Sequence, residues 1–111
     1  MKEQTQAILR EARGLLAGED VSQIFLFGSR AREVEDSDSD VDLIVILNRK
    51  EPFSSFMERS ATIVELRKRL FKLSSMYGLD LLVFTKADWD HFIQGGSSFS
   101  KEILDEARDV A

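Results

Sequence analysis

Two aspartates stand at alternate positions at the start of an apolar run, Asp40-Val41-Asp42 followed by LIVIL. In a β-strand, the side chains at i and i+2 point to the same face, with their Cα atoms roughly 6.5–7 Å apart. Two carboxylates at that spacing can share divalent cations, and Mg²⁺ prefers oxygen ligands. A pair of cations about 3.5–4 Å apart stabilises both the attacking and the leaving oxygen of a displacement at phosphorus. The aspartate pair therefore predicts a metal site suited to phosphate chemistry.

A third carboxylate, Asp80, lies near the start of another apolar run. It is the only charged residue within 79–85 (LDLLVFT). A charge in a buried strand is costly unless it is paired or bound to a metal ion. We therefore predict that Asp80 completes one metal site and catalytic centre with Asp40 and Asp42.

A glycine–serine pair, Gly28-Ser29, ends the apolar run 21–27. Gly28 has no Cβ and tolerates positive φ, so the backbone there can come close to a phosphate group. Ser29 supplies a hydroxyl and can begin a short helix whose N–H groups face an anion. Arg30 and Arg32 follow within reach of triphosphate oxygens. We predict that these four residues bind a nucleotide.

Two other interpretations fit the acidic segment. The aspartate pair could be solvated at the edge of a strand, and residues 36–40 (DSDSD) imitate the start of a calcium-binding EF-hand loop. An EF-hand requires glycine at position six and glutamate at position twelve. Val41 and Leu47 stand there instead. The glycine–serine pair upstream and Asp80 downstream favour the site for metal and phosphate.

Composition narrows the class of protein further. With 111 residues, the chain is expected to form one domain, 1–111. The absence of cysteine excludes disulfides and thiol catalysis. A net charge of −5 offers no positive surface for long duplex nucleic acid, although a small anion can still bind at a local positive turn. No apolar run approaches the ~18 residues that would span a membrane. We expect a cytoplasmic protein.

The apolar pattern predicts helices that alternate with strands, and therefore a small α+β domain. We expect helices before residue 18, within 28–39, over 53–71, around 89–93 and over 99–110, and strands over 21–27, 40–47 and 79–85. The inward-facing positions should include Phe56, Met57, Ile63, Val64, Leu70 and Phe71 in the helix at 53–71, and Phe99, Ile103, Leu104, Ala107 and Val110 in the helix at 99–110. The expected sheet has about three strands. The link between its first two strands is short for a parallel crossover, so a mixed or antiparallel sheet is at least as plausible as a parallel one.

The motifs and their spacing resemble the nucleotidyltransferase signature of the DNA polymerase β superfamily, in which Gly-Ser, ten residues and Asp-x-Asp follow one another. Gly28-Ser29 and Asp40-Val41-Asp42 fit this signature without a gap, and Asp80 follows in the family's order. The chain is similar to the minimal nucleotidyltransferases, which contain little beyond the catalytic core. This resemblance implies a polymerase β-like fold over nearly the whole chain.

The resemblance also implies an activity. Ser29 and the Gly28 backbone would hold the β- and γ-phosphates of ATP, the three aspartates would hold two Mg²⁺ ions, and Asp80 would help to activate an acceptor hydroxyl. Many minimal nucleotidyltransferases are similar to the antitoxin of a toxin–antitoxin pair, and they add AMP to a tyrosine of a small helical HEPN-domain partner.

One departure from the family keeps an alternative open. Glu33 stands where members commonly have glycine. The chain could therefore be a weakly catalytic or non-catalytic binding module that neutralises a HEPN partner by forming a complex. A second copy of the chain could also complete the site. The sequence does not identify the nucleotide or the acceptor.

Overall fold

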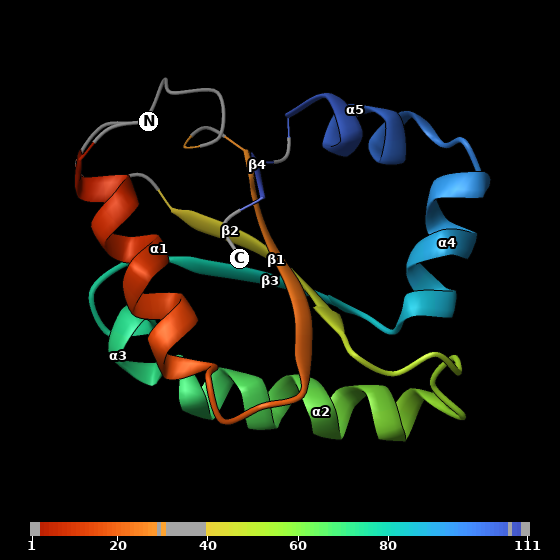
Figure 1. Cartoon of the computed structure of the whole chain (residues 1–111), viewed down its shortest axis with the longest axis horizontal. Helices are drawn as coiled ribbons and strands as arrows, with labels where there is room; N and C mark the ends of the chain where they lie inside the picture. Colours follow the sequence, from red (N-terminus) through yellow and green to blue (C-terminus); the bar gives the residue numbers. More distant parts are fainter. Residues whose placement is uncertain (1–2, 29, 31–39, 107, 110–111) are drawn as a thin grey trace.

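The computed structural model describes residues 3–28, 30, 40–106 and 108–109. The elements are, in chain order, α1 (Glu3–Leu15), β1 (Val21–Phe27), β2 (Val41–Leu47), α2 (Phe56–Arg69), α3 (Phe71–Ser74), β3 (Leu79–Phe84), α4 (Lys86–Gln94), α5 (Ser98–Glu106) and β4 (Arg108–Asp109). Within this part of the chain the strands form one sheet in the order β3-β2-β1-β4 (Figure 1). The helix expected within 28–39 falls outside the described residues.

The sheet is mixed. β1 pairs with β2 in the antiparallel sense, and β2 pairs with β3 in the parallel sense. This confirms the predicted α+β fold with a small mixed sheet backed by helices. α2 and α3 lie on the crossover between the two parallel strands, where a long connection is needed.

The two-residue strand β4 corrects the expected end of the chain. A helix was predicted over 99–110, but α5 ends at Glu106, and β4 pairs with Phe25 and Leu26 of β1. Pairing with β4 satisfies backbone groups on the outer side of β1, because each N–H and C=O of a strand needs a partner. A strand of this length is too short to show an alternating pattern in the sequence.

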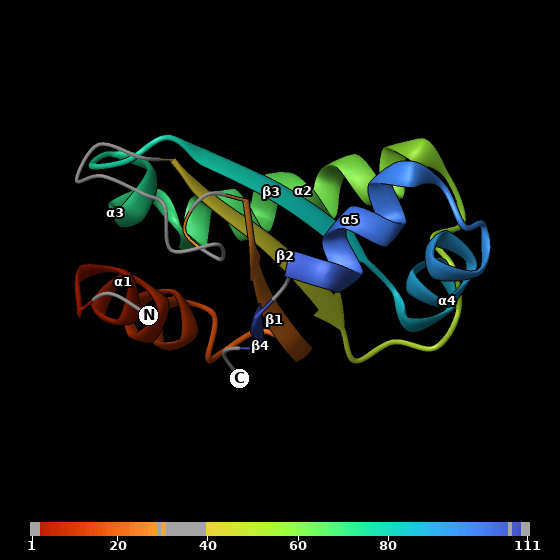
Figure 2. The same ribbon diagram turned by 90° about the horizontal axis from the view of Figure 1, so that it is seen from above.

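The central strand β2 is apolar on both faces, as a strand covered on both sides must be. Val41, Leu43 and Val45 pack into a core with α1, α2 and α3, whereas Ile44 and Ile46 pack into a second core with α4 and α5. Figures 1 and 2 show these two groups of helices around the sheet. Leu43 is fully buried, so we expect its truncation to alanine to cost about 2–5 kcal/mol of stability.

α2 differs most from the prediction. Its N-cap is Ser55, whose Oγ accepts a hydrogen bond from the Glu58 N–H (3.1 Å). Leu66 is the buried residue of α2, whereas Phe56, Met57 and Val64 are exposed, and so is Phe71 at the start of α3. The expected inward face is therefore wrong for these four residues, whereas Leu70 is buried and Ile63 packs against the core as predicted. The helix carries two apolar stripes, and a helix packed on one side can bury only one of them.

The last two helices follow the prediction in part. The predicted helix around 89–93 is present as α4, and the Thr85 Oγ1 caps its N-terminus by accepting from the Asp88 N–H (3.2 Å). In α5, Ile103 is buried as expected, but Phe99 and Leu104 are exposed. Among the described residues, no helix has the length and apolar character needed to cross a membrane.

Candidate active site

Asp42 and Asp80 lie side by side on neighbouring strands. In the parallel pairing of β2 with β3, Asp42 stands directly opposite Asp80. Residues in register on adjacent strands project from the same face of a sheet, and a hydrogen bond joins these two side chains. The structure therefore brings together two predicted site residues that are far apart in the sequence.

The surroundings of Asp42 favour its protonated form. Burial is the main cause, followed by the hydrogen bond to Asp80 and by the negative charges of Asp80 and Asp40. Together they raise the pKa of Asp42 from 3.8 to about 6, although the nearby Arg30 cation opposes the shift. A cation between carboxylates that are crowded in this way stabilises their ionised forms.

Asp40 lies at the edge of the same site. It precedes β2 and is exposed, whereas Val41 after it is fully buried in the core on the other side of the sheet. The Asp40 carboxylate packs closely against Gly78, so a side chain at position 78 would displace the carboxylate. The Val41 N–H also donates to the Gly78 carbonyl (2.8 Å), so the start of β2 is fixed against the turn before β3.

Gly28 lies against the Asp42 carboxylate. It follows β1, whose last residue, Phe27, pairs with Asp42. Its φ is 77°, a conformation that favours glycine, and the Asp42 carboxylate occupies the space that a Cβ would need. Gly28 is thus constrained by its backbone conformation and by the carboxylate beside it. Ser29 and Arg32, two of the predicted nucleotide-binding residues, fall outside the described part of the chain.

Arg30 lies beneath the site rather than facing a ligand. It is fully buried, and it donates from Nη1 to the Thr5 Oγ1 (3.0 Å) and from Nε to the Asp40 carbonyl (3.3 Å). Its Cζ also lies 5.4 Å from the centre of the Tyr77 ring. This placement departs from the predicted contact with triphosphate oxygens. A buried guanidinium needs such partners, and here they connect α1 to the start of β2.

Thr5, Tyr77 and Gly78 are neighbours of the site that the sequence did not predict. Thr5 offered a weak signal, because it is a polar residue on the buried face of α1. Gly78 offered another, because it precedes the strand that carries Asp80. Nothing in the sequence marks Arg30 as a buried residue, because arginine is rarely fully buried without partners.

The carboxylate oxygens of the site are the ligands that divalent cations prefer. Ionised carboxylates are acceptors only, and a cation can take the place of a proton shared by Asp42 and Asp80. Among the described residues, no group of three or more His, Cys, Asp or Glu side chains is arranged to hold a metal ion. The shared role of Asp40, Asp42 and Asp80 as metal ligands therefore stays a prediction.

Comparison with known families identifies the class of protein. Residues 11–95 match the family model described as Polymerase beta, Nucleotidyltransferase. This range is more than half of the chain and contains Gly28 and all three aspartates. The chain therefore belongs to the polymerase beta nucleotidyltransferase family.

Solved structures share its fold. A toxin–antitoxin crystallised with AMP-PNP has a TM-score of 0.58 and 17% sequence identity, over 93% of this chain and 72% of that chain. A mutant of the toxin–antitoxin MntA-HpeT has a TM-score of 0.55 and 15% identity, over 93% of this chain and 71% of that chain. Another MntA-HpeT mutant has a TM-score of 0.51 and 18% identity, over 98% of this chain and 72% of that chain. No curated protein sequence matches the chain.

Proposed function

We propose that the chain is a Mg²⁺-dependent nucleotidyltransferase that transfers AMP from ATP to a hydroxyl group. The observation that carries the proposal is the hydrogen-bonded pair of Asp42 and Asp80, packed against Gly28 where three strands meet. Membership in the nucleotidyltransferase family supports the type of reaction. Single-domain organisation over 1–111 belongs to the same proposal.

Each predicted site residue has a role in this reaction. Asp40, Asp42 and Asp80 hold the Mg²⁺ ions. Gly28, with Ser29 and Arg32, binds the β- and γ-phosphates, because a glycine without a Cβ lets backbone N–H groups approach an anion. Mg²⁺ held by these carboxylates would neutralise charge on the triphosphate and on the attacking and leaving oxygens. Arg30 acts from beneath, by holding the backbone of Asp40.

The chemistry is a displacement at the α-phosphorus. The acceptor oxygen forms a bond to that phosphorus, the bond to the bridging oxygen breaks, and pyrophosphate leaves. Asp80, which is exposed, would accept the hydroxyl proton, and Asp40 and the half-buried Asp42 would hold the cations. A base must lie within hydrogen-bond reach of the proton that it accepts, and Asp80 lies at the open side of the pair.

We propose that the acceptor is a tyrosine of a small helical HEPN-domain partner. This follows from the resemblance to minimal nucleotidyltransferases. It is supported by the structures with a similar fold, which are toxin–antitoxins, one of them with AMP-PNP. One MntA-HpeT mutant carries Asp-to-Glu changes two positions apart, the spacing of Asp40 and Asp42 here.

The second candidate function is a binding module that neutralises its partner without transfer. The exposed Phe56 and Met57 on α2 favour it, because a large apolar surface marks a contact with another protein whether or not a reaction follows.

Intact-mass spectrometry separates the two functions. A HEPN-domain protein co-expressed with the chain is incubated with Mg²⁺ and ATP. We expect it to gain one or more AMP units with the wild type and with Asp90→Asn, an exposed acidic residue on α4, but not with Asp42→Asn. A stable complex on size exclusion without any mass gain would support the binding module and overturn the transfer reaction.

A further inference from the structure

α2 carries a stripe of large apolar side chains on the molecular surface. Phe56 is 83% exposed, Met57 80% and Val64 52%. At about 100° per residue, these three positions fall within one arc of about 100° on the helix, and Met57 and Val64 are two turns apart. Leu66, which faces the core, lies on another side of α2. An apolar stripe of this kind on a charged helix marks a surface that another molecule covers.

The acidic residues of α2 lie away from the apolar stripe. Glu58 pairs with Arg49 at 2.8 Å, whereas Glu65 lies 3.9 Å from Arg69, whose closer partner is Glu19 at 2.9 Å. By helical position, both carboxylates fall outside the arc of Phe56, Met57 and Val64.

Three of the four basic residues of α2 have no acidic partner among the described residues. Arg59, Arg67 and Lys68 are exposed, and none of them forms an ion pair with a described residue. By helical position, Arg67 lies within the arc of the apolar stripe, between Phe56 and Val64, and Lys68 lies just beyond Met57. The face is thus positive, although the net charge of the chain is −5.

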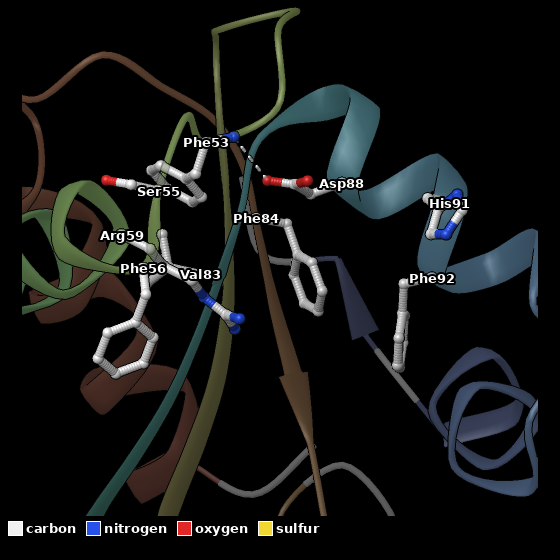
Figure 3. Close-up of a pocket in the computed structure, with 9 residues that line it drawn as sticks. All are labelled: Phe53, Ser55, Phe56, Arg59, Val83, Phe84, Asp88, His91 and Phe92. Carbon is white, nitrogen blue, oxygen red and sulfur yellow. Dashed lines mark hydrogen bonds between the residues drawn. The ribbon is translucent and has the colours of Figure 1, made fainter.

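An aromatic hollow lies at the N-terminal end of the stripe. It has a volume of about 540 Å³, and its walls include Phe56 and Arg59 from α2, Phe84 at the end of β3 and Phe92 from α4. Figure 3 shows the Arg59 guanidinium between the rings of Phe56 and Phe84. Apolar pockets with a few polar groups hold the anchoring side chains of protein interfaces.

We propose that the stripe and the hollow form one docking face for an acidic amphipathic helix of a partner protein. The apolar side of that helix covers Phe56, Met57 and Val64. Its acidic residues meet Arg67 and Lys68, and one bulky side chain enters the hollow beside Arg59. A helix laid on an apolar surface through residues about one or two turns apart is a common mode of recognition.

The charges select this occupant over two others. In a symmetric dimer, the cations of α2 would face the α2 cations of the second copy, so self-association through this face is opposed. An anionic membrane would also attract the cations, but the net charge of −5 opposes approach of the whole molecule, and a flat bilayer does not fill a hollow.

The docking face and the candidate active site are separate. The hollow lies at the C-terminal end of β3, and Asp80 lies near its N-terminal end. A docked helix therefore leaves Asp42 and Asp80 open. Docking itself does not depend on nucleotidyl transfer, whereas the further statement that the docked protein is also the acceptor rests on the function proposed above.

Fluorescence anisotropy with designed peptides tests the docking face on the full chain. The probes are three labelled helical peptides, one with a leucine stripe and flanking glutamates, one with the same stripe and flanking lysines, and a scrambled form of the first. We expect the glutamate peptide to bind about tenfold more tightly than the other two. Val64→Asp should weaken that binding about tenfold, and Lys68→Glu should shift the preference toward the lysine peptide.

Matched controls come from α5. Leu104→Asp changes an apolar residue of similar exposure, 54%, and Lys101→Glu reverses an exposed charge. Both should bind the glutamate peptide about as tightly as the wild type, and circular dichroism verifies that every variant is folded. Equal losses for Leu104→Asp and Val64→Asp would overturn the proposal, and so would the absence of any preference for the glutamate peptide.

Two further measurements identify a different occupant. Sedimentation would show a dimer that Val64→Asp dissociates if the occupant were a second copy. Binding to phosphatidylserine vesicles, but to none of the peptides, would point to a membrane. Either result overturns the proposal. The Asp42→Asn variant should bind the glutamate peptide as the wild type does, so a failure of nucleotidyl transfer and a failure of docking can be told apart.

Discussion

Asp42 and Asp80 face each other across parallel strands and share a hydrogen bond. Two carboxylates can share such a bond only while one of them is protonated. The raised pKa of Asp42, about 6, means that this proton is lost close to neutral pH. Above that pH the pair holds two negative charges, which a bound cation would neutralise.

Asp42→Asn tests whether the pair binds a metal-bound nucleotide. We expect the substitution to abolish Mg²⁺-dependent binding of AMP-PNP in isothermal titration calorimetry, because an amide is a poor replacement for a carboxylate ligand. Asp90→Asn is the control, since it removes an exposed acidic residue of α4. If Asp42→Asn bound Mg²⁺ and AMP-PNP as tightly as the wild type, the assignment of the metal site would be wrong.

The pKa of Asp42 predicts a pH dependence of stability. Its folded-state pKa, about 6, is above the ordinary value of 3.8, so the native state binds this proton more tightly than the unfolded chain does. The resulting stabilisation is complete below about pH 4 and is lost as the pH rises through about 6. The Tm of Asp42→Asn should therefore rise relative to the wild type between about pH 4 and pH 7.

Thermal melts at several pH values measure this difference. Asp90→Asn should follow the wild type over the whole range. A constant difference in Tm between Asp42→Asn and the wild type would contradict the raised pKa. Added Mg²⁺ should raise the Tm of the wild type but not that of Asp42→Asn, because a ligand that binds only the native state stabilises it.

Gly28→Ala should damage both stability and the site. A Cβ at this position meets the Asp42 carboxylate, and the φ of 77° is unfavourable for alanine. We expect a loss of about 1–3 kcal/mol in the free energy of unfolding and weaker binding of Mg²⁺ and AMP-PNP.

Gly14→Ala is the matched control for that substitution. Gly14 lies in α1 and has nothing within 4 Å of an added Cβ, so alanine should be neutral or should stabilise the helix by up to about 1 kcal/mol. Urea denaturation gives both values. An equally small effect of both substitutions would show that the Gly28 turn tolerates a side chain.

Arg30→Met tests the buried cation beneath the site. It leaves the Thr5 hydroxyl and the Asp40 carbonyl without this donor, so we expect a loss of about 2–4 kcal/mol in the free energy of unfolding. Arg67→Met changes an exposed arginine and should cost no more than about 0.5 kcal/mol. A small loss for Arg30→Met in urea denaturation would mean that its contacts contribute little.

The sequence predicted the parts of this protein that have a strong local pattern. The alternation of Asp40 and Asp42 around an apolar residue is visible in three positions, and Asp80 stands out as the lone charge in its strand. Their meeting depends on the parallel register of β2 with β3, which no local pattern reveals. The sequence therefore indicated which carboxylates to consider, and the topology determined that Asp42 and Asp80 touch.

Other features depended on packing and could not be read locally. The apolar pattern of α2 fits two different faces, and only the position of the sheet selects Leu66 over Met57 and Val64 for burial. β4 has only two residues, which is too few to show the alternation of apolar and polar residues that is typical of a strand. Arginine is usually a surface residue. Arg30 is buried because it contacts Thr5 and Tyr77, which come from distant parts of the chain.

The parallel pairing of β2 with β3 also bears on how the chain folds. Asp80 reaches Asp42 only after the chain has crossed through α2 and α3, and non-local parallel pairings of this kind form slowly. A partly folded chain that has only the hairpin of β1 and β2 lacks one half of the carboxylate pair. Affinity for a cation should therefore appear late, with the completed sheet, so that cation binding would report the end of folding.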